Sequence, residues 1–330
     1  MIREIAVVYV SWRDGEELLE AVTSLADARR RIPPGGVKVR LTIVDNGAGL
    51  PPAPFRALWP DASFLVNAEN RGFGPAANQA ARAAAADAIL FLNPDTRADG
   101  EPFSAIAAAF EADPGVVAVA PRLIEMTGPP PADGPLRLAP PGREDQATFQ
   151  LRKLPTLGSD ARELLLLDHL RPNNGPRRAF RYADADRGRA FPIEQAAAAA
   201  LAVRSDAFAR VGGFDERFVP AWHEDVDLCA RLGDEGRILY LPAARFRHRG
   251  GESASRLGYD RFLPIFYRNA IRYRAAHYGA AARLAYRLLL VKGMALRLLV
   301  LPLRADVPRP RPEAARAYLR VLKVALGLAA

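Results

Sequence analysis

Residues 88–96 read Ala-Ile-Leu-Phe-Leu-Asn-Pro-Asp-Thr, a short apolar run that stops abruptly at a polar turn. An Ala-rich stretch over residues 75–87, typical of a helix, comes immediately before it. Upstream, residues 4–10 and 39–44 are apolar runs typical of strands, and residues 14–31 between them have helical spacing of leucine and valine. Strands that alternate with helices and are apolar throughout indicate an α/β fold, with a mostly parallel sheet covered by helices on both faces.

Polar residues follow three of the predicted strands close to the point where each strand ends. They are Asp45, Asn70 and Asp95, and the strand before Asn70 is a third apolar run over residues 62–66. Ligands of open α/β sheets bind beyond the carboxyl ends of the strands, so these residues are candidates for chemistry. Asn and Asp are also favoured in turns, where their side chains bond to nearby backbone, and for any one of them alone a simple turn is the better interpretation.

A second polar cluster, Trp222-His223-Glu224-Asp225-Val226-Asp227, lies in the later half of the chain. His248 follows further on, after a strand predicted over residues 237–241. Helical spacing places Glu224 and Asp227 on nearly the same side of a helix and directs Asp225 elsewhere. One carboxylate can then face a cleft while the others pair or cap. Capping is the competing explanation, because acids in the first turn of a helix are stabilised by its dipole.

These residue types fit three requirements of sugar transfer from a nucleotide donor: a contact with the nucleobase, neutralisation of the departing diphosphate, and a base for the acceptor hydroxyl. A carboxylate such as Asp45 can accept a hydrogen bond from a nucleobase ring N–H. Asp95 can bind a hard divalent cation that neutralises the diphosphate, with His248 as an additional ligand. Asp225 is the candidate base, and a single in-line displacement would invert the anomeric configuration.

Five ordered blocks of the sequence, from the first strand to about Ser253, together resemble the family 2 glycosyltransferases, especially their bacterial rhamnosyltransferase-like branch. The blocks are Val44-Asp45-Asn46, Asn70-Arg71-Gly72-Phe73-Gly74 with Asn78, Leu92-Asn93-Pro94-Asp95-Thr96, Gly212-Gly213-Phe214-Asp215-Glu216, and Glu224-Asp225-Val226-Asp227-Leu228 with Arg231, followed by His248 and Ser253. Five blocks in order are far more specific than any one of them.

The resemblance implies a Rossmann-like GT-A fold, a nucleoside-diphosphate sugar donor, and Mg2+ or Mn2+ as cofactor. The family's Asp-x-Asp metal and donor motif falls on Asn93-Pro94-Asp95, so Asp95 should contact the metal, and a downstream histidine of that site aligns with His248. The family's base aligns with Asp225, and Glu224 beside it is the other expected catalytic residue. The other expected site residues are Asp45, Asn70, Arg71, Asn78 and Asn93 on the nucleotide-sugar side, and Trp222 and His223 on the acceptor side. Ala196 to Ala200 stand where the branch has a glycine-containing strand, which leaves the acceptor open.

The positive charge of the chain is concentrated near its carboxyl-terminal end. The formal net charge is +9 over 330 residues. Residues 256–330 hold 15 Lys or Arg against 3 acids, a net charge of +12. Subtracting +12 from +9 leaves a net charge of −3 on residues 1–255. We therefore expect a catalytic domain over residues 1–255 and a basic amphipathic helical tail over residues 256–330. Within the catalytic domain, residues 125–190 are expected to be an insertion or mobile lid, with a helix only at 162–170.

Several features bear on location and partners. The single cysteine, Cys229, lies among helix-forming residues and predicts a buried structural thiol. We see neither a secretory leader nor a stretch of about 18 uncharged apolar residues. From residue 261 onward, apolar residues interleave with Arg, which fits helices on an anionic membrane surface as well as a helix pair packed on the catalytic domain.

We therefore expect a cytoplasmic protein, peripheral on the inner face of the cell membrane, that acts in cell-surface polysaccharide assembly. Its donor would be dTDP-rhamnose or a UDP-sugar, and its acceptor a glycan or polyprenyl-linked glycan. A mildly acidic catalytic part argues against nucleic acid as a partner. The sequence leaves the donor sugar, the linkage and the oligomeric state open.

Two other classes of protein compete with this interpretation. In an NAD(P)-dependent oxidoreductase, Gly72-Phe73-Gly74-Pro75-Ala76-Ala77 would be a dinucleotide-binding turn. A polar stretch separates it from the preceding strand, however, and Pro75 occupies the turn, neither of which suits that fingerprint. A non-enzymatic protein that binds membrane surfaces would explain the basic tail, and membrane attachment is equally compatible with an enzyme.

Overall fold

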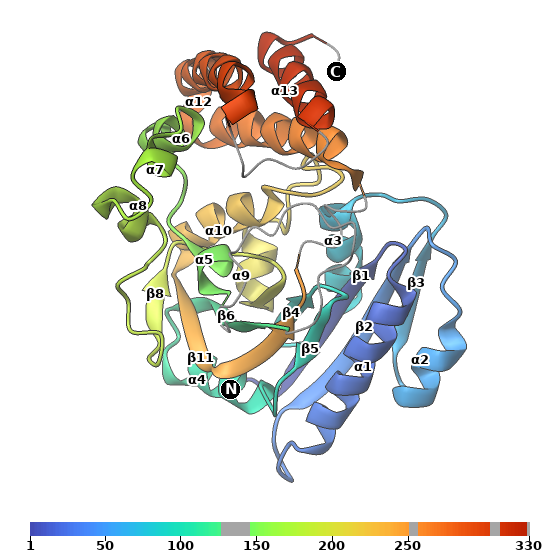
Figure 1. Ribbon diagram of the computed structural model, residues 1–330. Helices are drawn as coiled ribbons and strands as arrows, with labels where there is room; N and C mark the ends of the chain where they lie inside the picture. Colours follow the sequence, from blue (N-terminus) through green and yellow to red (C-terminus); the bar gives the residue numbers. More distant parts are fainter. Residues whose placement is uncertain (127–145, 251–256, 304–310, 329–330) are drawn as a thin grey trace. The chain divides into compact units, whose positions relative to one another are not determined.

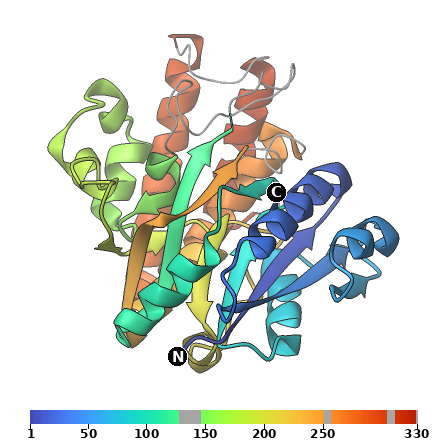
Figure 2. The same ribbon diagram turned by 90° about the horizontal axis from the view of Figure 1, so that it is seen from below.

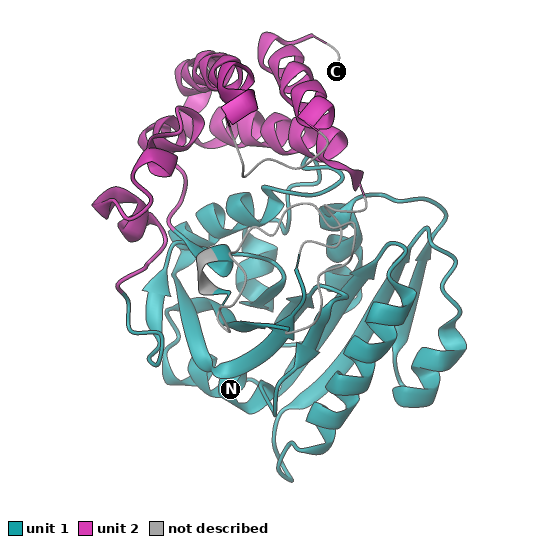
Figure 3. Ribbon diagram, in the orientation of Figure 1, with its two compact units in different colours: residues 1–128, 139–152, 185–250 teal, residues 129–138, 153–184, 251–330 magenta. Residues whose placement is uncertain are grey.

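The computed structural model describes residues 1–126, 146–250, 257–303 and 311–328 (Figure 1). Ser253 of the sequence resemblance lies outside these ranges. The chain forms two compact units, each assembled from separate stretches (Figure 3). The first unit comprises residues 1–128, 139–152 and 185–250, and the second comprises residues 129–138, 153–184 and 251–330.

The first unit is built on a mixed β-sheet. Its strands are β1 (Glu4–Ser11), β2 (Lys38–Asn46), β3 (Ser63–Asn67), β4 (Ala88–Leu92), β5 (Thr96–Ala98), β6 (Val116–Glu125), β8 (Phe191–Ile193), β10 (Ala200–Arg204) and β11 (Arg237–His248). The strand order is β3-β2-β1-β4-β10-β6-β11-β5, with β8 also paired to β11, and can be followed in Figure 2. Strands β3, β2, β1 and β4 are parallel, whereas β10 is antiparallel to both of its neighbours.

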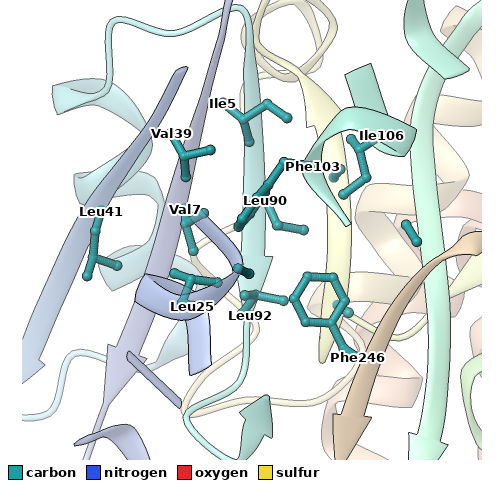
Figure 4. Packing of buried hydrophobic residues seen from close by; sticks show 14 of the residues in the cluster. Ile5, Val7, Leu25, Val39, Leu41, Leu90, Leu92, Phe103, Ile106 and Phe246 are labelled. Carbon is teal, nitrogen blue, oxygen red and sulfur yellow. The ribbon is translucent and has the colours of Figure 1, made fainter. Parts of the chain in front are cut away.

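Helices pack on both faces of this sheet. They are α1 (Gly15–Arg30), α2 (Pro52–Leu58), α3 (Phe73–Ala83), α4 (Phe103–Ala112), α5 (Ala147–Gln150), α9 (Ser205–Arg210) and α10 (Glu224–Glu235). Alternate residues of a strand point to opposite faces, so a strand that is apolar throughout requires two cores. On one face, Val7 of β1 packs in a buried cluster with Leu25 of α1 (Figure 4). On the other, the ring of Phe91 lies 5.3 Å from Phe208 and 5.0 Å from Phe214. The predicted α/β fold is confirmed.

The second unit is helical in the part that the structure describes. It contains α6 (Leu157–Leu164), α7 (Leu167–Leu170), α8 (Gly175–Phe180), α12 (Tyr259–Val300), the 3-10 turn η1 (Leu301–Leu303) and α13 (Arg311–Leu326). The helix predicted over residues 162–170 is wrong as one element, because Leu166 adopts left-handed φ of 61° between α6 and α7. Gly279 likewise interrupts α12, with φ of 79°.

A buried ion pair joins two parts of the second unit that lie far apart in sequence. Arg274 of α12 donates from Nε to Asp160 of α6 at 3.0 Å, and both side chains are nearly inaccessible. Residues 153–184, part of the predicted insertion, therefore pack with the helices of the predicted tail. Within the described ranges, no helix is long and apolar enough to cross a membrane.

Candidate active site

Asp45 ends β2 and is buried. Its Oδ1 accepts a hydrogen bond from the backbone N–H of Ala48 at 2.7 Å, and its Oδ2 accepts one from Leu50 at 2.8 Å. A carboxylate has about four acceptor positions, so these bonds organise the loop after β2 and leave acceptor capacity for a nucleobase N–H. The predicted nucleobase contact of Asp45 stays a prediction.

Asn46, the next residue, fixes the turn that carries Asn70 and Arg71. Its Nδ2 donates to Asn70 Oδ1 at 3.0 Å and to the Gly72 carbonyl at 3.3 Å, and its Oδ1 accepts from the Arg71 backbone N–H at 3.1 Å. The side chains of Asn70 and Arg71 lie on the surface beside this network. The buried amide of Asn46 thus holds two predicted nucleotide-sugar residues next to Asp45.

Asn78 of α3 has a different set of partners. Its Oδ1 accepts from the Phe214 backbone N–H at 2.9 Å, and its Nδ2 donates to the Phe214 carbonyl at 2.8 Å and to Glu216 Oε1 at 3.1 Å. Both amide hydrogens are therefore used to anchor the Gly-Gly-Phe-Asp-Glu block of residues 212–216. A contact between Asn78 and the nucleotide sugar stays a prediction, and the visible role of this side chain is to position that block.

The alanine run before β10 connects the two predicted halves of the site. Its Ala199 carbonyl accepts the backbone N–H of Asn93 at 3.1 Å, and its Ala198 N–H donates to Asp225 Oδ2 at 3.4 Å. The Asn93-Pro94-Asp95 turn and the carboxylate of Asp225 are therefore attached to adjacent residues of the turn between β9 (Gln195–Ala196) and β10. Two sequence blocks more than 130 residues apart meet here.

Asp95 and His248 lie together and are both buried. His248 Nε2 is 3.4 Å from Asp95 Oδ1, and Asp95 Oδ2 accepts the backbone N–H of Gly250 at 3.0 Å. Burial raises the pKa of Asp95, but when His248 is protonated its charge and its hydrogen bond, together with the hydrogen bond from Gly250, outweigh burial and hold the pKa of Asp95 below its ordinary value.

These two residues fit a cation that is shared with a substrate. No group of three or more His, Cys, Asp or Glu side chains with the geometry of a metal site occurs among the residues that the structure describes. Mg2+ is commonly bound through one or two carboxylates together with substrate phosphates and water. His248 Nε2 is buried and has no hydrogen-bond partner within the described ranges, so a nitrogen ligand faces the Asp95 carboxylate.

Glu224 and Asp225 begin helix α10, after a distorted stretch of backbone. Trp222 and His223 have φ values of 73° and 71°, in the left-handed region that residues other than glycine rarely adopt. Each such residue costs on the order of 1–3 kcal/mol, and the cost is characteristic of functional sites. Trp222 is half-buried and His223 is buried, and both directly precede the two carboxylates in the chain.

The environments of the two carboxylates raise both of their pKa values. Burial, followed by the charge of Asp225, raises the pKa of Glu224 well above its ordinary value. Burial also raises the pKa of Asp225, and the N–H groups of Val226 and Ala198 and the charge of Arg152 oppose that rise only in part. A carboxylate with a raised pKa is a stronger proton acceptor than an ordinary one.

The neighbouring residues of α10 have structural roles. Asp227 accepts a hydrogen bond from Nε of Arg231 at 2.9 Å, which confirms that one acid of the cluster pairs within the helix. Cys229 is fully buried, and burial raises the pKa of its thiol to about 12, which confirms the predicted inert thiol. Asp225 therefore differs from its neighbours in being neither ion-paired along the helix nor fully enclosed.

Sequence analysis missed two residues of this region, Gln146 and Arg152. Gln146 contacts both the ring and the backbone of His248, and the charge of Arg152 acts on Asp225. Both lie within the predicted insertion, in a stretch without the apolar periodicity that identifies buried elements. The pairing of β7 (Leu151–Arg152) with β9 (Gln195–Ala196), together with hydrogen bonds of Gln146 and Gln150 to β6, holds this segment at the site.

Known glycosyltransferases are similar to this chain in sequence and in fold. The family model for Glycosyl transferase family 2 matches residues 6–158, which include the Asp45, Asn70 and Asn93-Pro94-Asp95 segments. Over these residues the chain is similar to glycosyl transferase family 2. The turn at Gly72 also lies within the matched residues.

Particular relatives agree with this family. N-acetylglucosaminyl-diphospho-decaprenol L-rhamnosyltransferase of Mycobacterium tuberculosis (strain CDC 1551 / Oshkosh) is 28% identical over 266 residues, 76% of this chain and 78% of that protein. The solved structure of mannosyltransferase PcManGT from Pyrobaculum calidifontis, in complex with GDP-Man and Mn2+, has a TM-score of 0.51 at 14% identity, over 98% of this chain and 86% of that one. S. aureus TarS 1–349 in complex with UDP has a TM-score of 0.51 at 13% identity, over 98% and 90%. The GT-A fold is confirmed.

Proposed function

We propose that the protein is an inverting glycosyltransferase that moves a sugar from a nucleoside-diphosphate donor to a hydroxyl group of a glycan or lipid-linked glycan. One observation carries this proposal above the others. The Asp95 turn and Asp225 are held by adjacent residues, Ala199 and Ala198. A group suited to the diphosphate and a group suited to the attacking hydroxyl are thereby attached to one turn, between β9 and β10 of the first unit, to which we assign catalysis.

Asp225 is the proposed base. Its raised pKa makes it an effective acceptor for the hydroxyl proton as the acceptor oxygen attacks the anomeric carbon. The new C–O bond forms on the face opposite the departing diphosphate, so the configuration inverts and no covalent intermediate is needed. Glu224, in which burial and the charge of Asp225 favour the protonated form, keeps a second negative charge away from Asp225.

Asp95 and His248 are the proposed ligands of Mg2+ or Mn2+. A divalent ion bound there would neutralise the charge that develops on the departing diphosphate. The buried Oδ1 of Asp95 and Nε2 of His248, 3.4 Å apart, supply the hard oxygen and the nitrogen that such ions accept. Asp45, Asn70, Arg71, Asn78 and Asn93 remain the proposed contacts of the nucleotide sugar.

The relative of known activity favours a donor and an acceptor. Its name describes transfer of L-rhamnose to N-acetylglucosaminyl-diphospho-decaprenol. We therefore favour dTDP-rhamnose over a UDP-sugar, and a polyprenyl-diphosphate-linked glycan of cell-surface polysaccharide assembly as acceptor. Trp222 and His223, which precede the proposed base directly, are the proposed acceptor-side residues.

Such an acceptor would be presented at a membrane, and one side of α12 has exposed apolar and basic side chains that suit a membrane surface. Leu284, Leu288 and Leu299 are 59%, 57% and 79% exposed, at spacings that place them on one side of the helix together with Lys292. Apolar side chains beside basic ones suit the surface of an anionic bilayer. We propose peripheral attachment at the inner face of the cell membrane through this stripe, and no nucleic-acid partner.

The first test is nucleotide binding measured by thermal shift with UDP, dTDP, GDP, NAD and NADP, each with and without Mn2+. Ligands that bind only the folded state raise its apparent stability. Stabilisation by one nucleoside diphosphate, strengthened by Mn2+, is the expected result and identifies the donor class. Stabilisation by NAD or NADP alone would overturn the proposal. Product analysis by NMR then decides inversion, since retention of the donor's anomeric configuration would contradict it.

A further inference from the structure

Gln146 is a buried residue of the first unit that has no place in the proposed reaction. Its side chain is 5% exposed, and its backbone N–H donates to the Leu123 carbonyl of β6 at 3.1 Å. Its carboxamide makes two contacts with one other residue: Nε2 donates to the backbone carbonyl of His248 at 2.8 Å, and Oε1 lies 2.7 Å from His248 Nδ1.

These two contacts determine which ring nitrogen of His248 carries a hydrogen. A backbone carbonyl can only accept, so the NH2 group of the Gln146 amide must face it, and the amide oxygen must face His248 Nδ1. An amide oxygen also can only accept, so Nδ1 must be the nitrogen that donates. In a neutral imidazole the other nitrogen, Nε2, is then left with its lone pair.

The lone pair of Nε2 points to the proposed cation site. Nε2 lies 3.4 Å from Asp95 Oδ1 and has no hydrogen-bond partner among the residues described. Phe149 stacks on the imidazole with ring centroids 5.7 Å apart and planes inclined by 22°. At the ring edge, a Cβ on Gly250 would lie 3.3 Å from His248 Cε1. The ring is therefore confined in one orientation.

The segment that carries Gln146 is itself anchored. Gln150 is fully buried, and its side chain accepts from the Leu123 backbone N–H at 3.1 Å and donates to the Pro121 carbonyl. Both glutamines attach helix α5 and the residue before it to β6. Of these two side chains, the one that hydrogen-bonds to His248 is Gln146, whereas Gln150 bonds to β6. Gln150 therefore offers a matched control.

We propose that Gln146 is a positioning residue that fixes the Nδ1–H tautomer of His248 and so directs its Nε2 lone pair to the cation shared with Asp95. Hydrogen bonds of this kind, made by the ligand's other nitrogen, orient histidine ligands and raise their basicity. The binding of a cation by this lone pair rests on the proposed function. The position of the hydrogen on Nδ1 is independent of the proposed function, because it follows from contacts within the protein.

The tautomer is tested by NMR of the full chain labelled with 15N-histidine and kept free of metal. The chain has four histidines, and the signals of His248 are identified by their loss in His248→Gln. At a pH where the spectra show a neutral ring, we expect the hydrogen on Nδ1 in the wild type and a mixture of tautomers in Gln146→Leu. A hydrogen on Nε2 in the wild type, or an unchanged tautomer in Gln146→Leu, would overturn the proposal.

The consequence for the cation is tested by titrating Mn2+ in the presence of dTDP or UDP and following free Mn2+ by electron paramagnetic resonance. Loss of a histidine's outer hydrogen-bond partner typically weakens metal binding about 10-fold to 100-fold, which we expect for Gln146→Leu. Gln146→Glu keeps an acceptor for Nδ1–H and should restore most of the affinity. Gln150→Leu should lower thermal stability to a similar extent as Gln146→Leu while leaving Mn2+ affinity unchanged.

The two experiments separate this inference from the proposed function. A wild-type protein that shows the Nδ1–H tautomer but does not bind Mn2+ would overturn the cation site at Asp95 and His248, and with it the proposed use of the lone pair. If the wild type and Gln146→Leu bind Mn2+ with equal affinity, the role of Gln146 is overturned and the proposed function is left intact.

Discussion

At the scale of single residues, the carboxylate of Asp225 is the group on which turnover should depend most. Asp225→Asn preserves size and the acceptor for the Ala198 N–H but removes the proton acceptor. We expect kcat to fall about 10^2-fold to 10^4-fold, the usual contribution of general base catalysis, while nucleotide affinity in thermal shift is unchanged. Turnover close to that of the wild type would mean that another group is the base.

The raised pKa of Asp225 predicts the pH dependence of the reaction. A base must be unprotonated, so kcat/KM should fall as pH decreases through this raised pKa, and the midpoint should lie above the value of about 3.9 for an ordinary aspartate. The charge of Arg152 opposes the rise, so Arg152→Leu should move the midpoint upward and Arg152→Lys should move it less. Profiles of kcat/KM against pH that coincide for all three proteins would contradict this electrostatic role of Arg152.

Glu224 predicts a change in stability with a definite sign. Its Oε2 is buried without a hydrogen-bond partner among the described residues, and burial raises its pKa, so ionisation is less favourable in the folded than in the unfolded state. Stability is therefore lost as pH rises toward that raised pKa. Glu224→Gln cannot ionise, so its free energy of unfolding should exceed that of the wild type at neutral pH.

This gain should shrink as pH falls toward about 4.3, the value for an ordinary glutamate, because both states of the wild type are then protonated. Urea unfolding at several pH values measures the difference between the two proteins. A variant that is equally stable, or less stable, at neutral pH would show that the Glu224 carboxylate is better solvated than its burial indicates.

At the scale of elements, the Asp160–Arg274 pair should be the main polar determinant of the contact between α6 and α12. Burial raises the pKa of Asp160 although the charge of Arg274 lowers it, so Asp160 depends on that arginine to stay ionised. Removing one partner of a buried pair typically costs 3–5 kcal/mol, and we expect roughly that loss for Arg274→Met in chemical unfolding.

Two comparisons make this prediction specific. The double variant Asp160→Leu and Arg274→Met should recover much of the loss, because no charge is then left buried alone. Arg210→Ala breaks a pair with Asp206 in which both side chains are about half exposed or more, and it should change stability little. Equal losses in the single and double variants would mean that packing, and not the unpaired carboxylate, dominates.

The elements that could be predicted from sequence are those with strong periodicity. Apolar runs gave β1 and β4 almost to the residue, because strands buried on both faces have no polar interruption. The single helix predicted over 162–170 is interrupted at Leu166, since four leucines in succession, residues 164–167, give no sign of a left-handed φ. The strand predicted over 237–241 continues as β11 to His248, across an irregular register after Leu241.

The same contrast applies to the site. Asp95 and His248 were predicted as partners from their residue types and from the family resemblance, and they lie 3.4 Å apart. Gln146 could not be predicted, because its contact with His248 spans 102 residues and glutamine is common in surface loops. A buried amide that serves another side chain leaves no periodic pattern in the sequence.

At the scale of the whole molecule, the apolar stripe on α12 should decide binding to lipid. We expect Leu284→Asp with Leu288→Asp to weaken binding to vesicles that contain phosphatidylglycerol on the order of 100-fold, from the loss of two buried leucines at about 1.5 kcal/mol each. Flotation of the purified chain measures this. Val66→Asp, at a residue of β3 that is 64% exposed, is the control. Binding unchanged in the double variant would assign any membrane contact to another surface.

The division of the chain into interleaved stretches also imposes an order of events during synthesis. Asp160 is made 114 residues before Arg274, its partner in the second unit. At about 5–20 residues per second, this interval lasts roughly 6–23 s. Throughout that time Asp160 and Leu164, the buried side chains of α6, lack the residues of α12 that cover them, although the residues of β1 to β6 have already been made. Ribosome-associated chaperones that recognise exposed leucines would meet the chain at this segment, and a stall of translation before residue 274 would leave the second unit unable to close.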